Sequence, residues 1–336
     1  GSVRLNVGPN GRYNGGISAN RREGKLTLSG DAGYRHDTQK GVQTIDRATL
    51  DTVSGQFLPS VYDATQENEG GGLNLRGGVD YDLDKQNRLS GEVRFRGLNF
   101  DSDVFETSSA RNALGGVSRA YSRTSEASMK RDNSAVSADW RRQLKGADHL
   151  LTSHLEYEVT DFTRDSHAIL RNTPGATVYE TQGFDIEQTR ANLKVDYSKP
   201  LPGDVKLKAG VDFEVAQNDY DNRGASGAAL GSLTVDPSRT NRFLYDQDVY
   251  AAYVTYERPF GDLTVQGGLR AEQVNIATDQ LTSNQKNQND YFKVYPSLHM
   301  GYTLNENNAL SANYSHRVQR PGAQDLNPYR VYIDPY

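Results

Sequence analysis

The feature that most constrains the fold is an alternation of apolar and polar side chains with a period of two. In residues 73–83 (LNLRGGVDYDL), the odd positions are apolar or Gly, and the even positions are Asn, Arg, Gly and Asp. Successive side chains of a strand point to opposite faces, so this segment predicts a strand with one apolar and one charged face. The same alternation recurs in residues 25–34, 151–159, 192–197, 205–215, 263–271 and 310–318. We therefore expect an all-β chain.

Two kinds of connection separate the expected strands. Short polar turns are predicted near residues 22–25, 83–87, 145–149, 200–204, 259–262 and 305–308. Long loops rich in Ser, Thr, Asn, Asp, Gln and Gly are predicted near residues 38–66, 104–128, 166–178, 222–241 and 280–289. The unit of strand, turn, strand and long loop gives about six hairpins and about 12 strands in one domain over residues 1–336. Many strands would be about 12–18 residues long, beyond the usual 5–6.

Composition excludes several classes of protein. Lys+Arg 38 against Asp+Glu 43 gives a net charge of −5, whereas dedicated nucleic-acid binders are usually basic. The chain has no Cys, which excludes disulfides, thiolate metal sites and cysteine nucleophiles. Its longest apolar run is residues 249–254, far short of the about 20 residues of a transmembrane helix. The 20 Tyr and 10 Phe are nevertheless too many for a disordered polar chain.

The asymmetry between the two ends of the strands predicts a transmembrane β-barrel. The strands of a β-sandwich also alternate, but they are short and their loops are similar at both ends. Outer-membrane barrels combine short periplasmic turns with long extracellular loops, and a tilted strand crosses the bilayer in about 9–11 residues. Hydrophobic residues make up only 35% of the chain, as expected if one face of each strand lines water. We expect an antiparallel up-and-down barrel, closed so that its backbone is satisfied in lipid, in the outer membrane of a Gram-negative cell.

Aromatic residues near the short turns support this placement. Rings of amphipathic aromatic side chains are typical of a membrane interface, although Tyr and Phe also favour strands in general. The residues in question are Tyr81, Trp140, Tyr197, Tyr256, Phe260 and Tyr302.

A series of motifs in residues 240–336 resembles the barrel of TonB-dependent outer-membrane receptors, in their outer-membrane β-barrel branch. The motifs are GGLRAE at 267–272, VYPSL at 294–298, NYSHRVQRP at 313–321, DLNPY at 325–329 and DPY at 334–336. The remainder of the chain matches only in the rhythm of strands and loops. Pro296 would lose a hydrogen bond within a paired strand, so we expect a bulge or a strand start there.

The resemblance implies a 22-stranded barrel closed by an N-terminal plug that couples to the TonB energy-transducing complex. About 12 strands do not complete such a barrel, so the chain is expected to be an internal barrel fragment that lacks the plug and the C-terminal strands. A complete 12-stranded barrel is the alternative. The expected partners are TonB through the plug, lipopolysaccharide and outer-membrane lipid, and a small-molecule or glycan ligand, with no nucleic acid.

No catalytic residue, metal site or cofactor is expected. The six His show no compact ligand spacing with a carboxylate, and Ser315 and His316 point to opposite faces of a strand, so they cannot act as a pair. The acidic segments 99–103 and 219–223 are expected to be solvated loops, with calcium binding as the alternative. Tyr-rich loops offer stacking surfaces for a glycan or an aromatic chelate, at Tyr62, Tyr121, Tyr179, Tyr220 and Tyr245.

Most charged residues of the expected strands lie at the alternate positions that would face the barrel interior. Opposite charges on neighbouring strands are expected to pair. A few of them could contact substrate, but the ligand-binding residues stay unassigned. The inward charged residues are Arg76, Asp80, Glu92, Arg94, Arg96, Lys206, Lys208, Asp212, Glu214, Arg270, Glu272 and Arg317.

The resulting functional prediction is TonB-dependent active import of a scarce, bulky nutrient such as a ferric siderophore, cobalamin or a glycan. The alternative is a passive porin, or a barrel that serves as a surface anchor or adhesin without a plug. A membrane-embedded hydrolase is a third, weaker reading, because no nucleophile elbow or phosphate loop is present. We expect no enzymatic activity.

Overall fold

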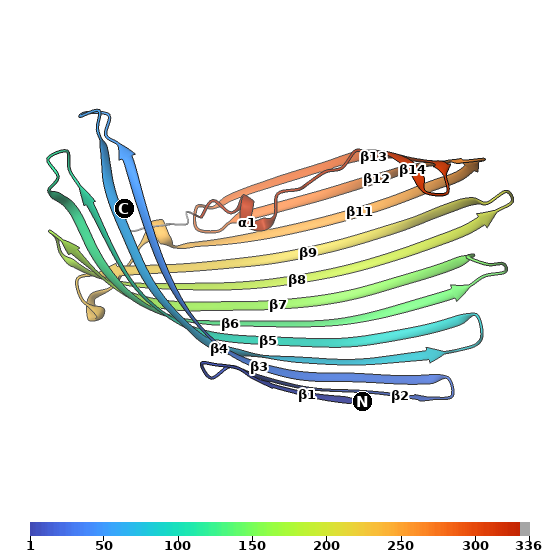
Figure 1. Cartoon of the computed structure of the whole chain (residues 1–336), viewed down its shortest axis with the longest axis horizontal. Helices are drawn as coiled ribbons and strands as arrows, with labels where there is room; N and C mark the ends of the chain where they lie inside the picture. Colours follow the sequence, from blue (N-terminus) through green and yellow to red (C-terminus); the bar gives the residue numbers. More distant parts are fainter. Residues whose placement is uncertain (330–336) are drawn as a thin grey trace.

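The computed structural model describes residues 1–329 and contains one antiparallel sheet of 14 strands (Figure 1). Neighbours in the sheet follow the chain order, except that the short strand β10 pairs only with β9. The strands are β1 Ser2–Val7, β2 Tyr13–Glu23, β3 Leu26–Leu50, β4 Phe57–Asp82, β5 Asn87–Arg111, β6 Val117–Gln143, β7 Leu150–Thr173, β8 Thr177–Leu201, β9 Val205–Gly227, β10 Thr234–Val235, β11 Asn241–Phe260, β12 Leu263–Gln280, β13 Gln285–Asn305 and β14 Asn308–Ser315.

Helical structure is confined to single turns. They are the 3-10 helices η1 Leu230–Ser232 and η2 Pro237–Arg239 and the α-helix α1 Ala323–Leu326. Within residues 1–329, no helix is long and apolar enough to span a membrane. The predicted all-β, up-and-down antiparallel architecture is confirmed, and the two strands beyond the expected 12 are β1 and the short β10.

The sheet is strongly curved (Figure 1). Strands β1 and β14 form its two edges, and in the described part of the chain they pair with β2 and β13 but not with each other. The short connections at one end of the sheet lie at residues 24–25, 83–86, 144–149, 202–204, 261–262 and 306–307.

Register aligns the alternating side chains into continuous rows across the strands. Leu28 of β3 lies opposite Val79 of β4, and further along the same row Leu155, Leu193 and Phe213 lie opposite one another on β7, β8 and β9. Such rows form an apolar face and, at the intervening positions, a charged face. Leu28 and Leu155 are 49% and 50% exposed, so no second layer of protein covers the apolar face.

The apolar face is a band of limited depth. On β4 it comprises positions 73, 75, 77, 79 and 81, a segment that matches the about 9–11 residues with which a tilted strand crosses a bilayer. Further from the short turns the same face becomes acidic, at Glu69 on β4 and its neighbour Asp101 on β5. Tyr81, Tyr256, Phe260 and Tyr302 are exposed on this face beside the short turns.

The segments expected to be long loops are mostly strand, which corrects the prediction. Strands β3 and β4 pair from Leu26 and Tyr81 as far as Leu50 and Phe57, so only residues 51–56 connect them, although residues 38–66 were expected to be loop. The other connections on the side away from the short turns are residues 8–12, 112–116, 174–176, 228–240 and 281–284. Beyond the apolar band, β3 and β4 are mostly polar without regular alternation, which is typical of loops, so periodicity could not reveal these extensions.

Pro296 also differs from expectation, because it lies inside β13 without a bulge. Its carbonyl accepts a hydrogen bond from the amide of His316 at 3.1 Å, so the missing N–H faces the β14 side of the strand. The ladder with β14 ends there, at the pairing of Ser297 with Ser315. The proline therefore removes a donor where regular strand pairing stops.

A charge on the apolar face tests its contact with hydrocarbon. Leu155 lies at the middle of the apolar positions 151–159 of β7, so Leu155→Arg should lower the free energy of unfolding by about 2–4 kcal/mol in lipid vesicles. The control is His154→Arg on the charged face, which places the same new cation one residue away beside Asp139 and should leave stability nearly unchanged. Urea titration of the whole protein in vesicles measures both values, and equal losses would contradict the two-faced assignment.

Candidate functional site

The charged face carries a lattice of ion pairs across neighbouring strands. Arg76 of β4 contacts Glu92 of β5 at 2.5 Å, and Arg94 of β5 pairs with Glu156 two strands away on β7. The carboxylate of Glu92 lies between two cations, because Arg94 also approaches it at 3.5 Å. Further pairs on this face are Arg88–Asp80, Arg190–Glu214, Lys206–Glu257, Arg270–Asp212 and Arg270–Glu272. The expected cross-strand pairing is therefore present for most of the predicted inward residues.

Arg270 is the centre of this lattice near β11–β13. Its guanidinium donates to Glu272 at 2.6 Å and to Asp212 at 3.1 Å, and it lies 5.5 Å from the ring centroid of Tyr253. The Tyr253 hydroxyl donates to the carboxylate of Asp196. One aromatic ring thus lies between a cation and an anion, and a hollow of about 290 Å³ lies beside it.

The chain folds back over the charged face after β14. Arg320 donates to the Tyr291 hydroxyl at 3.0 Å and pairs with Glu272, whose side chain is 7% exposed. Asn241 of β11 donates to Asn327 at 2.8 Å, and Gln182 of β8 donates to the hydroxyl of Tyr329 at 2.6 Å. We call residues 316–329 the return segment.

An apolar cluster lies under the return segment. Ala323 of α1 packs against buried residues of β9, β11 and β12, and the amide of Gly322 donates to Asp325 at 2.9 Å, which caps the single turn. The cluster comprises Tyr220, Phe243, Tyr245, Val249, Val274 and Ile276. It places an aromatic patch on the otherwise charged face.

The return segment explains the motifs on which the family resemblance was based. Arg320 of the NYSHRVQRP motif holds Glu272 of the GGLRAE motif, whereas Asp325, Asn327 and Tyr329 of the DLNPY motif form the cap and the wall contacts. The strand β14 ends at Ser315, so His316 and Arg317 lie outside the strands on which they were predicted. The DPY motif at 334–336 lies outside the described residues.

A second feature of the charged face is a hollow of about 370 Å³ near the connections at 51–56 and 112–116, which we call the rim hollow. Tyr62 shares the parity of Arg76 on β4, so the rim hollow opens on the charged side of the sheet. Two rows of register neighbours line it, namely Arg47, Ser60, Ala110 and Arg119, and Ile45, Tyr62, Ser108 and Tyr121.

A chain of polar contacts lies directly beneath the rim hollow. Tyr62 donates to Glu106 at 3.0 Å, and Arg123 lies 3.6 Å from Glu106 and 3.5 Å from Glu180. Arg239 of η2 completes it by donating to Glu180 at 2.8 Å. Both carboxylates are buried and paired. Burial, and then the neighbouring Glu106 carboxylate, raise the pKa of Tyr62 to about 12.

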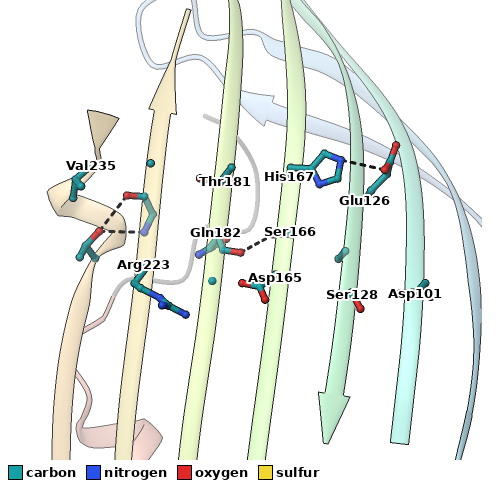
Figure 2. Close-up of a pocket in the computed structure, with 15 residues that line it drawn as sticks. Asp101, Glu126, Ser128, Asp165, Ser166, His167, Thr181, Gln182, Arg223 and Val235 are labelled. Carbon is teal, nitrogen blue, oxygen red and sulfur yellow. Dashed lines mark hydrogen bonds and ion pairs between the residues drawn. The ribbon is translucent and has the colours of Figure 1, made fainter. Parts of the chain in front are cut away.

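Another hollow, of about 730 Å³, opens mainly on the other side of the sheet, and Figure 2 shows the residues that line it. His167 contacts Glu126 at 3.1 Å, and Asp101, Asp165 and Arg223 also line this hollow. Asp101 shares the parity of the apolar positions of β5, so the hollow belongs to the face that continues the apolar band. It therefore does not open toward the charged interior.

The structure separates the five tyrosines expected to offer stacking surfaces. Tyr62 and Tyr121 line the rim hollow, Tyr220 and Tyr245 lie under the return segment, and Tyr179 lies at the parity of the apolar face. In residues 1–329, no group of three or more His, Asp or Glu side chains is arranged to hold a metal ion. This holds for the acidic segments 99–103 and 219–223, which are strand rather than loop.

Removal of the Arg320 side chain should release the return segment. Arg320→Ala leaves the buried Glu272 carboxylate with fewer donors, so the contact should lose about 1–3 kcal/mol. Hydrogen exchange at residues 322–329 should become faster, as measured by mass spectrometry. Arg317→Ala is the matched control, because it removes an exposed cation from the same segment. Unchanged exchange in Arg320→Ala would show that the ion pair does not hold the segment.

Alkaline titration tests the environment of Tyr62. Its pKa is raised in the folded protein, so the stability that neutral Tyr62 contributes is complete below pH 10 and is lost as the pH rises through about 12. The absorbance difference at 295 nm between the wild type and Tyr62→Phe should rise with a midpoint near pH 12. A midpoint near 10, the ordinary tyrosine value, would contradict the buried contact with Glu106.

Comparison with known proteins places these features in a family. Residues 142–336, more than half of the chain, match the model of the outer membrane protein beta-barrel family. No curated protein matches the chain. Among solved structures, the ferric citrate transporter FecA in its unliganded form is similar with a TM-score of 0.51 at 12% identity, over 89% of this chain. The chain spans only 43% of the length of FecA.

Two other structures are similar at lower scores. The translocator domain of the autotransporter NalP from Neisseria meningitidis has a TM-score of 0.27 at 11% identity, over 88% of this chain and 82% of NalP. The ferric yersiniabactin uptake receptor FyuA from Yersinia pestis has a TM-score of 0.28 at 9% identity, over 91% of this chain and 66% of FyuA. The family match over residues 142–336 and the two-faced antiparallel sheet lead to one conclusion: this chain belongs to the outer membrane protein β-barrel family and spans the outer membrane with its strands.

Proposed function

We propose that the protein imports a scarce, bulky nutrient across the outer membrane in a TonB-dependent manner. The observation that carries the proposal is the charged, ion-paired face that runs across the whole sheet opposite the apolar band. A face of this kind suits the wet interior of a wide barrel. The similarity of the fold to FecA, a ferric citrate transporter, supports the same reading.

The proposal includes parts of the protein beyond residues 1–336. Unpaired backbone at the edges of β1 and β14 would be costly in hydrocarbon, so additional strands would close the barrel. By the family resemblance, the complete barrel would have 22 strands around an N-terminal plug. TonB would act on that plug, and the return segment would lie on the wall that faces it. Lipopolysaccharide and lipid would contact the apolar band.

The transported ligand would be a ferric siderophore, cobalamin or a glycan. The barrel wall would act as scaffold and conduit without covalent chemistry, and no catalytic arrangement is proposed for it. A passive porin, or a barrel that anchors a surface structure, is the alternative in which no plug is present.

Growth of a deletion strain tests the proposed import. Deletion should slow growth when one source among iron chelates, cobalamin and glycans is limiting, and removal of TonB should cause the same defect with no further loss in the double deletion. Complementation with the intact gene is the control. Normal uptake of every source without dependence on TonB would reject the proposal, and open conductance of the purified protein in a planar bilayer would favour the porin.

A further inference from the structure

We propose that the edge of β3 beyond the end of β2 docks an extended segment of another polypeptide at the cell surface, which adds one strand to the sheet. The edge comprises residues 40–50, which we call the free edge. This inference goes beyond the proposed import, because it concerns an interaction surface outside the membrane and is independent of the cargo.

The free edge exists because β2 is shorter than β3. Pairing of β3 with β2 ends at His36, whereas its pairing with β4 continues to Leu50. The connection at residues 8–12 turns the chain back there, and the side chain of Arg12 donates to the carbonyl of Thr38 at 3.0 Å. Figure 1 shows β3 and β4 continuing past β2 and bending away from it.

The backbone groups of alternate residues point toward the free edge. At the start of the ladder between β3 and β4, the amide of Asp82 donates to the carbonyl of Lys25 at 2.9 Å. At its other end, the amide of Asp51 donates to the carbonyl of Gln56 at 2.8 Å. Odd positions of β3 therefore pair with β4, and even positions turn their N–H and C=O groups the other way. From position 40 onward the even positions meet no other strand of residues 1–329. They are Lys40, Val42, Thr44, Asp46, Ala48 and Leu50, and all six are exposed.

The position of the free edge relative to the apolar band decides what can cover it. Positions 73–81 of β4, which form the band, lie opposite positions 26–34 of β3, so the free edge lies beyond the hydrocarbon on the side away from the short turns. In outer-membrane barrels the short turns are periplasmic, which places the free edge at the cell surface. Unpaired N–H and C=O groups of a strand edge are a template for another strand, as in β-augmentation.

The side chains of the free edge favour pairing rather than prevent it. The edge contains no proline, and its ladder with β4 has no bulge, although both features are common on strand edges that avoid pairing. Lys40 is turned toward Glu67, at 2.9 Å. Val42 and Leu50, near its two ends, are 82% and 50% exposed, and Leu50 lies opposite Phe57, which is 69% exposed. Apolar side chains of an added strand would cover both ends.

Asp46, at the middle of the free edge, selects the charge of the partner. Its carboxylate makes no ion pair within residues 1–329, and its register neighbour Val61 is apolar. Opposite charges on neighbouring strands attract, so an added strand would carry a basic residue opposite Asp46. The expected partner segment therefore has a basic residue with an apolar residue four positions to either side, opposite Val42 and Leu50. A second copy paired centre to centre would instead place two Asp46 carboxylates opposite each other, which is unfavourable.

Synthetic peptides that span positions 42–50 test the charge of the partner. The first peptide has valine at both ends, arginine at the centre and threonine elsewhere, and the second has aspartate in place of the arginine. Fluorescence anisotropy measures binding of each labelled peptide to the whole protein in detergent micelles. The arginine peptide should bind about fivefold more tightly than the aspartate peptide, and Asp46→Lys should reverse this preference.

Proline substitutions test the pairing of the backbone. Ala48→Pro removes one N–H from the free edge and leaves the ladder with β4 intact, because proline is tolerated where the N–H faces away from the sheet. It should weaken binding of the arginine peptide about tenfold. Ala48→Ser keeps the N–H and is the matched control. Thr44→Pro, with Thr44→Ala as its control, repeats the test at a second position, and heat-modifiable migration on gels verifies that each variant remains folded.

The outcomes decide between a docking edge and a solvated one. A preference for the arginine peptide that reverses in Asp46→Lys, with weaker binding in the proline variants but not in their controls, supports the proposal. Failure of both peptides to bind, or unchanged binding in folded proline variants, overturns it. A dimer of the wild type that Ala48→Pro converts to a monomer would assign the free edge to a second copy and would also overturn it. The growth of the deletion strain tests the import separately.

Discussion

Satisfaction of backbone hydrogen bonds is the constraint on which the rest of this structure depends. In hydrocarbon an unpaired N–H or C=O is costly, and a paired sheet meets this demand for every strand except those at its edges. Once neighbouring strands satisfy the backbone hydrogen bonds, the side chains of one strand can face lipid on one side and water on the other. Leu155 can face lipid while Glu156, the next residue, pairs with Arg94 on the opposite face. The period of two in the sequence is the direct consequence.

The interactions on the charged face differ from those on the apolar face. Many cations and anions of the charged face pair with an opposite charge on the same strand or a nearby one, and Glu92 and Glu272 each lie between two arginines. Pairing of this kind makes a charged wall compatible with a rigid barrel. An ion pair also holds the return segment, because Arg320 pairs with the Glu272 carboxylate, which Arg270 also contacts.

The function of such a wall depends on regions that differ from the rest of the charged face. Most of the face carries paired charges, but two regions differ. The cluster around Tyr220 and Phe243 is apolar and is covered by the chain itself. The rim hollow combines small residues on β4 and β5 with large residues on β3 and β6.

Much of this followed from the sequence alone. Alternation in segments such as 73–83 and 205–215 determined the strands of the apolar band, the two faces and the order of the hairpins, because side chains on a strand must alternate. The inward charges, from Arg76 to Glu272, were also identified from parity. The sequence did not reveal those parts of the strands in which odd and even positions have similar polarity. Beyond the band, β3 and β4 continue with mostly polar residues and no regular alternation, so composition alone made residues 38–66 resemble a loop.

Only the tertiary structure decided which residues meet. Arg47, Ser60, Ala110 and Arg119 come from four strands, and nothing in their local sequences marks them as neighbours, since register depends on how many residues each connection contains. The return segment had a sequence signal in its motif, but its contacts with Glu272, Asn241 and Gln182 needed the curved sheet to bring β8, β11 and β12 under one short segment. The sequence by itself determined which side of each strand faces water, because that choice is local. The placement of the rim hollow and of a folded-back segment on that side is long-range, so only the assembled sheet could settle it.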